Sequence, residues 1–196
     1  MGKQSKSVDN IFLNRPTIKD YISLEGIVKN DVDIVITVLK PNMILRIKTF
    51  KIKPKKVDLW DLSWSDLILL REMIKEKNIS GVLELIYSVS QEKFLELDVF
   101  NCFAVYKWIN EQLALITKEE IFYLNDEPTQ KEKDAGIDDL NEFGYTVSLD
   151  VLANGNILEY DNYLRKPYHQ IFRKFRLNKT KNEIQKKYID NASRKN

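Results

Sequence analysis

Apolar residues recur at every second position in two runs within the first third of the chain. From Val32 to Leu39 and again from Met43 to Phe50, apolar residues recur at every second position, on either side of Lys40-Pro41-Asn42. Period-two alternation of β-branched residues around a Pro-Asn turn is typical of two antiparallel strands. The pattern predicts one β-hairpin over roughly residues 32–52, and a short helix that starts at Thr17 precedes it.

Apolar residues return at three- and four-residue spacing beyond the hairpin, which indicates amphipathic helices. Ser63-Trp-Ser-Asp66 opens a helix that ends near Asn78, and residues 80–89 form a second, shorter one. Ser90 caps the longest helix, with a break expected near Asp98. We therefore expect a mainly α fold, a helical bundle with one N-terminal β-hairpin (α+β).

The segment after this long helix, 118–134, is polar and contains Pro128, and it is the best linker candidate in the chain. Short capped helices are expected beyond it, among them one over residues 149–153 that Asn154-Gly155 closes. A capping box from Thr180 to Glu183 predicts the start of a separate terminal helix. The expected organisation is a flexible N-terminal arm (1–15), a helix plus β-hairpin (16–57), a helical core (58–125) and a C-terminal helical region with a basic tail (126–196).

Composition narrows the class of protein. The chain has 196 residues, 43% of them hydrophobic, enough to fill one sizeable core or two small ones. Cys102 is the single cysteine, so no internal disulfide can form, which fits a reducing compartment such as the cytosol. The longest apolar runs are about six residues, well short of the roughly twenty that a membrane helix needs, and no membrane contact is expected.

The residue types that usually carry chemistry are sparse. His169 is the single histidine and lies in a Lys/Arg-rich segment, where a structural role is the simpler reading. Cys102 lies among aromatic residues, as a buried, inert thiol would. Acidic groups at helical or strand spacing lack the pattern of a calcium loop and are expected to face water: Asp31, Asp33, Asp134, Asp138, Asp139 and Glu142. We therefore predict no catalytic residue, no metal ligand and no cofactor, and hence no enzyme.

Charge is strongly segregated along the chain. The formal net charge is +2, but residues 163–196 hold eleven Lys or Arg and two acids, +9, whereas residues 92–161 hold five Lys and sixteen acids, −11. Such a dipole favours contact with partners or with copies of the same chain. The candidate partner-contact residues are the basic ones of the tail: Arg165, Lys166, Arg173, Lys174, Arg176, Lys179, Lys181, Lys186 and Lys187.

Two kinds of partner are open for this tail. Basic residues interleaved with aromatic ones can follow a phosphate backbone and stack on bases, with strong salt dependence. The aromatic residues Tyr168, Phe172 and Phe175 recur at helical spacing, however, and are expected to face the protein's own core. Protein contact is therefore the preferred prediction, and nucleic-acid binding through the C-terminal helix is the alternative of another class.

A series of short motifs in the second half of the chain suggests a family. They are Ala135-Gly-Ile-x-x-Leu140, Phe143-Gly144, Leu149-Asp-x-Leu-Ala153-x-Gly155, Ile157-Leu158-x-Tyr160 and Pro167-Tyr168-x-x-Ile171-Phe172. In order and spacing, residues 58–190 resemble small virion or tail-assembly proteins of tailed bacteriophages, particularly the crAss-like group.

The resemblance implies a non-enzymatic role and carries over no site residues. The expected function is that of a head–tail connector (neck) ring component, with a tail-assembly chaperone as the alternative. The expected partners are other phage structural proteins and copies of the same chain, with possible DNA contact through the basic tail. The expected location is the virion, after assembly in the host cytoplasm.

Overall fold

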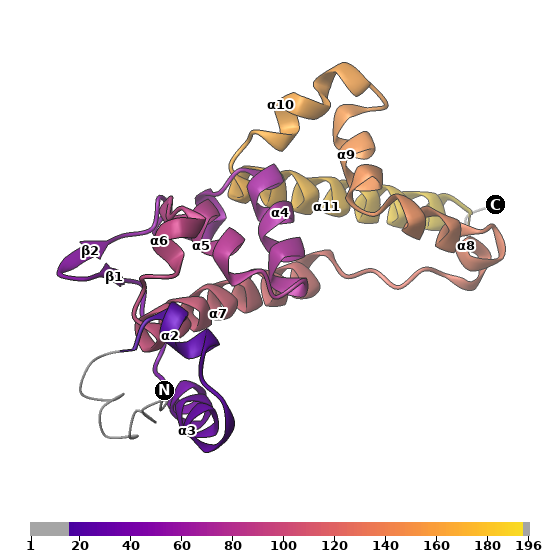
Figure 1. Ribbon diagram of the computed structural model, residues 1–196. Helices are drawn as coiled ribbons and strands as arrows, with labels where there is room; N and C mark the ends of the chain where they lie inside the picture. The colour runs from indigo at the N-terminus through magenta and orange to yellow at the C-terminus, as the bar shows by residue number, and fades with distance from the viewer. Residues whose placement is uncertain (1–15, 194–196) are drawn as a thin grey trace, which may run out of the picture. The chain divides into compact units, whose positions relative to one another are not determined.

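A computed structural model describes residues 16–193, and the expected N-terminal arm, 1–15, lies outside these residues. The protein is mainly α-helical with a two-stranded antiparallel sheet near the N-terminus (Figure 1), which confirms the predicted fold class. The chain forms two compact units. Of the described residues, unit 1 takes 16–57 and 69–114, and unit 2 takes 58–68 and 115–193.

Unit 1 is built around the first part of a long helix, α7. Its apolar positions Val105 and Ile109 are completely buried, as are Leu83 of α5 and Leu97 of the preceding turn. The elements that lie wholly or partly in this unit are α2 (Ile18–Ile22), α3 (Gly26–Val38), β1 (Leu45–Ile47), β2 (Phe50–Ile52), α4 (Trp64–Lys75), α5 (Ile79–Tyr87), α6 (Gln91–Phe94) and α7 (Val99–Leu124).

Several helix ends lie where the local sequence predicts them. The Thr17 hydroxyl accepts a hydrogen bond from the Asp20 backbone N–H, and the Asp20 carboxylate accepts one from the Thr17 N–H, which completes a capping box at the start of α2. The expected break at Asp98 is also present, since α6 ends at Phe94 and α7 begins at Val99. The Asp98 carboxylate accepts a hydrogen bond from the Asn101 N–H at 2.7 Å, which caps the start of α7.

A hairpin is present, but the predicted positions of both strands and of the turn are wrong, since the turn is Lys48-Thr49 and not Pro41-Asn42. Residues 32–38 belong to helix α3, and the two strands are residues 45–47 and 50–52. The alternating run contains Val32, Val35 and Ile36, which also satisfy helical spacing, so its apolar pattern fits both structures. The ammonium of Lys107 on α7 donates to the carbonyls of Thr37 and Leu39 at 2.6 and 3.2 Å, which satisfies the last carbonyls of the helix.

Unit 2 contains most of the C-terminal half of the chain. Buried side chains of the unit include Leu59, Trp64, Leu149, Leu152 and Ile171. Besides the start of α4 and the end of α7, its elements are η1 (Leu59–Asp61), α8 (Gln130–Asp134), η2 (Ile137–Phe143), α9 (Tyr145–Ala153), η3 (Ile157–Glu159), α10 (Tyr160–Leu164) and α11 (Tyr168–Ser193).

Two expectations for this half of the chain are wrong. The polar segment that begins at Lys118 continues α7 as far as Leu124, so a much shorter connection, 125–129, leads to α8. The terminal helix does not begin at a capping box. Thr180 lies within the continuous helix α11, and its hydroxyl donates to the Arg176 carbonyl at 3.0 Å. Since residues 176–180 include neither Gly nor Pro, nothing in that stretch interrupts the helix.

The C-terminal cap of α9 is as predicted. Asn154 and Gly155 both adopt positive φ, 51° and 75°, and their N–H groups close the last turn of the helix. Of the helices in the described residues, none is long and apolar enough to cross a membrane.

Candidate partner-binding surface

The first half of α11 is fixed within unit 2 by a segment far away in the sequence. The Trp64 N–H donates to the Lys166 carbonyl at 3.0 Å, and the Tyr168 N–H donates to the Leu62 carbonyl at 2.8 Å. The Trp60 ring stacks on Tyr168, with centroids 5.5 Å apart, and tilts against Phe172 at 4.9 Å. The start of the basic tail is therefore part of the unit's own packing.

Three of the nine candidate cations, all on α11, hold this helix against other elements of unit 2. The guanidinium of Arg176 lies 3.7 Å from the centroid of the Tyr123 ring, a cation–π contact. The Lys179 ammonium donates to the Asn125 carbonyl at 2.7 Å. These contacts come from the end of α7 and the residue that follows it, a segment that the sequence pattern assigns to a linker.

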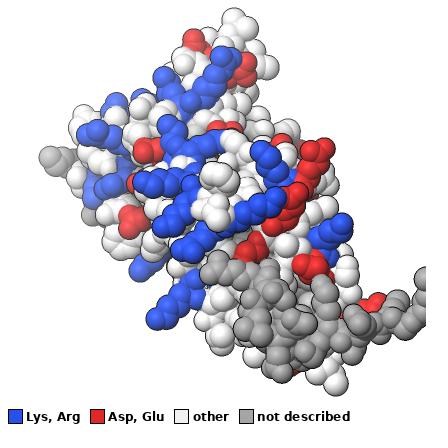
Figure 2. All heavy atoms as spheres, turned by 60° about the vertical axis from the view of Figure 1, so that its left-hand side comes forward, with Lys and Arg blue, Asp and Glu red and all other residues white. Residues whose placement is uncertain are grey.

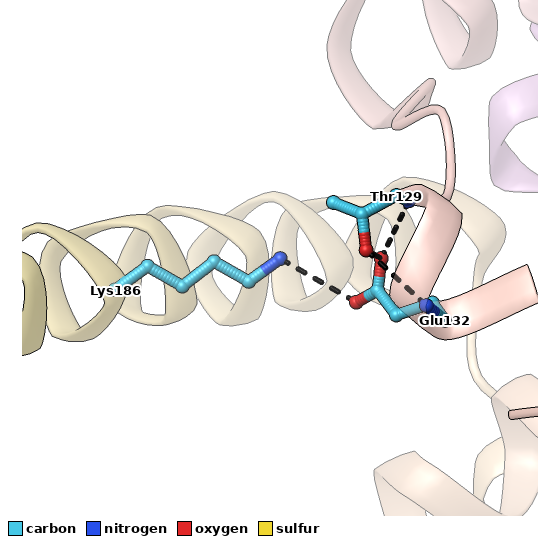
Figure 3. Close-up of polar contacts among 3 residues, drawn as sticks. All are labelled: Thr129, Glu132 and Lys186. Carbon is cyan, nitrogen blue, oxygen red and sulfur yellow. Dashed lines mark hydrogen bonds and ion pairs between the residues drawn. The ribbon is translucent and has the colours of Figure 1, made fainter. Parts of the chain in front are cut away.

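The third of these cations, Lys186, meets the short helix α8 (Figure 3). Its ammonium lies 3.8 Å from the Glu132 carboxylate. Glu132 also accepts hydrogen bonds from the backbone N–H and the hydroxyl of Thr129, at 2.7 and 2.8 Å, within a capping box. These two bonds, and to a smaller extent Lys186, lower the pKa of the carboxyl group. The carboxylate thus links the start of α8 to the distal half of α11.

Two further candidates lie before α11. Arg165 pairs with Asp161 at 3.3 Å, and both side chains are largely exposed, so this ion pair contributes little to stability. Lys166 is half-buried, and its carbonyl accepts the hydrogen bond from Trp64. Neither residue lies on the long helix that the charge pattern singles out.

The other four candidates are available to a partner. They are exposed, and within residues 16–193 they form no ion pair or hydrogen bond through their side chains: Arg173, Lys174, Lys181 and Lys187. The structure therefore divides the predicted site into cations that hold α11 in its own unit and cations that face solvent.

An apolar stripe runs between these free cations, and the sequence analysis did not identify it. Leu177, Ile184 and Tyr188 are 48%, 62% and 74% exposed. At 100° per residue they fall within about 40° of one another around the helix axis, on the side away from Phe172 and Lys179, which contact the unit's own residues. We call these three residues the outer stripe. Its seven- and four-residue spacing was a detectable signal, since it is the spacing of a helix-packing seam.

The candidates for chemistry remain separate from this surface. The Nδ1 atom of His169 lies 3.2 Å from the Asp61 carboxylate, and both side chains are about half exposed. His169 also borders an open cavity of about 510 Å³, which Lys118 and Glu119 line from α7. The residues that line this cavity include no Ser, Thr or Cys, so the His–Asp pair has no hydroxyl or thiol nucleophile there.

The single thiol is inert. Cys102 is completely buried in unit 1, and burial, together with the nearby Asp98 carboxylate, raises the pKa of its thiol to about 12. At neutral pH the group is therefore protonated, and a protonated thiol is a poor nucleophile and metal ligand.

The acidic groups do not assemble into a site. The four acids of residues 134–142 are exposed, as expected. Asp33 accepts a hydrogen bond from the Tyr21 hydroxyl at 2.6 Å, and burial and this bond raise the pKa of the tyrosine to about 12. Within residues 16–193, no cluster of three or more His, Cys, Asp or Glu side chains has metal-binding geometry.

The comparisons with known proteins add no family to this description. No protein-family model matches the chain, and searches of curated proteins and of solved structures find no significant match.

Proposed function

We propose that the protein is a non-enzymatic assembly protein of a tailed bacteriophage that acts through protein–protein contacts, most simply as a head–tail connector ring component. The outer stripe of α11 is the observation that carries the proposal. It leaves Leu177, Ile184 and Tyr188 in water on a helix that is already packed on its other side. The resemblance of residues 58–190 to phage virion and assembly proteins supplies the biological setting, the virion.

The small binding free energy expected from the outer stripe suits a contact that every subunit of a ring repeats. Burying a large apolar side chain contributes about 1.5–3 kcal/mol. For three side chains that are 48–74% exposed, this gives roughly 3–5 kcal/mol before the cost of association. One such contact is weak, but a closed ring forms the same contact at every subunit and becomes stable when all of them are satisfied.

The charges beside the stripe favour an acidic partner surface. Arg173, Lys174, Lys181 and Lys187 surround it and are not neutralised by described residues. The acid-rich segment 92–161 of a second copy, with its charge of −11, has the complementary sign. A contact between different surfaces of two copies is heterologous, and rotation by a fixed angle closes it into a ring. Interleaved apolar residues also favour protein over nucleic acid as the partner of α11.

Native mass spectrometry of the purified chain, at low and at high salt, tests the proposal. A connector subunit gives a discrete high-order oligomer that weakens as salt rises. Ile184→Asp places a charge in the outer stripe and is expected to shift the population to monomer. Gln185→Asp, one residue away and outside the stripe, is the matched control and is expected to leave the oligomer intact.

Two results would count against the connector. A stable small particle that binds a tail protein transiently would favour the chaperone alternative. A monomer at every concentration and salt, which neither assembles nor associates with virion proteins, would overturn the assembly role altogether.

A further inference from the structure

A second basic region lies in unit 1, outside the C-terminal tail. Residues 40–56, which we call the basic hairpin, include seven Lys or Arg and no acid. All seven are exposed: Lys40, Arg46, Lys48, Lys51, Lys53, Lys55 and Lys56. The side of the molecule that carries β1 and β2 has many Lys and Arg side chains on its surface (Figure 2).

The hairpin holds three of these cations in arrangements that folding alone does not favour. Arg46 and Lys51 are directly opposite each other in the antiparallel register, and like charges at such a position destabilise a sheet. Lys48, in the two-residue turn, has a φ of 54°, a conformation that Gly or Asn adopts more easily. A like-charged pair and a strained lysine in one short hairpin suggest that these positions serve binding.

Few of these charges are neutralised in place. Lys48 lies 3.4 Å from the Glu96 carboxylate, but both side chains are more than half exposed. Lys55 donates to the Glu84 carbonyl at 3.4 Å, which leaves its charge intact. Within residues 16–193 the other five cations of the hairpin form no ion pair. The hairpin thus presents a positive potential to solvent.

Hydrogen bonds to the helices of unit 1 keep the hairpin rigid. Asn101 of α7 accepts from the Arg46 N–H at 2.6 Å and donates to the Ile44 carbonyl at 3.0 Å. The Tyr87 hydroxyl donates to the Met43 carbonyl at 2.7 Å, and on the returning side the Lys55 N–H donates to the Ile86 carbonyl at 2.8 Å. A charged ribbon fixed at both ends loses little conformational entropy on binding.

We infer that the basic hairpin binds double-stranded DNA, through its phosphate backbone and without sequence specificity. Two-stranded β-ribbons fit the major groove, and Lys and Arg neutralise the phosphates on its edges. Phe50, 72% exposed at the tip of the ribbon, lies on the face opposite Arg46 and Lys51 in this register, so the cationic face alone meets the phosphates. On the same face of the ribbon as Phe50, Leu45 is completely buried, so the hairpin lacks the broad apolar face that a membrane-surface element inserts.

Fluorescence anisotropy with a short labelled duplex of arbitrary sequence tests this inference on the full chain. The affinity is expected to fall steeply between about 50 and about 200 mM salt, with a slope set by the number of phosphates contacted. Replacing Arg46, Lys51 and Lys53 together by Gln removes three cations and is expected to lower that slope by about 3. Thermal unfolding should show that the variant still folds, since the change also relieves the like-charged pair.

The matched control removes three exposed cations that lie outside both the basic hairpin and α11, by changing Lys19, Lys75 and Lys77 to Gln. It alters net charge equally and is expected to leave DNA binding within about threefold of the wild type. Equal losses in both variants would show an effect of overall charge, and a loss in the control alone would place DNA on another surface of the chain. Either result overturns the inference.

Two further probes examine the partner itself. Single-stranded DNA of the same length is expected to bind more weakly than the duplex, and tighter binding would overturn groove binding by the ribbon. Vesicles with anionic lipid are expected to bind less well than DNA, and binding to vesicles without binding to DNA would exclude the inference. Both probes are compared at one oligomeric state, checked by native mass spectrometry, so the result is separate from the proposed assembly role.

Discussion

The cation–π contact between Arg176 and Tyr123 decides whether part of the basic tail belongs to its own unit. The guanidinium carbon lies 3.7 Å from the ring centroid, well inside the range of such contacts, whereas Phe172 is near its limit at 5.9 Å. Arg176 is exposed, and exposed cation–π pairs contribute about 0.5–1 kcal/mol. We therefore predict a coupling free energy of about 0.5–1 kcal/mol between the two side chains.

A double-mutant cycle measures this coupling, with Arg176→Gln, Tyr123→Leu and the combined variant. Urea unfolding followed by tryptophan fluorescence in a Trp108→Phe background reports on unit 2, where Trp60 and Trp64 lie. For a urea dependence of about 2 kcal/mol per M, the coupling corresponds to about 0.25–0.5 M in the midpoint.

The control cycle pairs Tyr123 with Lys181, which lies on the opposite side of α11 by helical spacing. Its coupling is expected within about 0.3 kcal/mol of zero, as for independent sites. If the Arg176 cycle also gave zero, the guanidinium would not be held on its own unit. Arg176 would then join the cations that are free to bind a partner.

Three further predictions follow from single contacts. Cys102, whose thiol has a pKa raised to about 12 by burial, is expected to react with a disulfide reagent only after denaturation; fast reaction in native buffer would contradict its burial. Glu132 has a lowered folded-state pKa, so its contribution to stability is present above the unfolded-state pKa and disappears as pH falls through the folded-state value. In a carboxyl NMR titration Thr129→Ala should raise this pKa more than Lys186→Gln, and the reverse order would mean that the ion pair dominates. Asn101→Ala removes two hydrogen bonds to the hairpin and should lower the free energy of unfolding by about 1–3 kcal/mol, measured by chemical denaturation, and an unchanged value would show that the hairpin is held by other contacts.

Sequence reasoning succeeded where the cause of a structure is local. The Thr17 capping box, the break at Asp98 and the cap at Asn154-Gly155 each depend on residues within one or two turns. It failed at residues 32–38 because the apolar run suits both a strand and a helix. The ammonium that satisfies the end of that helix comes from Lys107, about seventy residues later in the sequence.

The candidate surface shows the same division. The charge of the tail was evident in the sequence, and so was the identity of its nine cations. Which of these cations form contacts within unit 2 depends on the positions of Tyr123, Asn125 and Glu132. Tyr123 and Asn125 can contact cations of α11 because α7 continues to Leu124, beyond the point where the polar sequence predicted a linker. The basic hairpin, by contrast, was hidden because the turn was predicted at Pro41-Asn42, whereas it lies at Lys48-Thr49.

The backbone hydrogen bonds from Trp64 to Lys166 and from Tyr168 to Leu62 also constrain how the protein matures. On the ribosome, the tryptophan segment emerges about a hundred residues before the start of α11, so unit 2 closes only after α11 has been made. During that interval Trp60 and Trp64 lack the aromatic rings that later surround them. A change in their fluorescence therefore reports when α11 packs against the tryptophan segment.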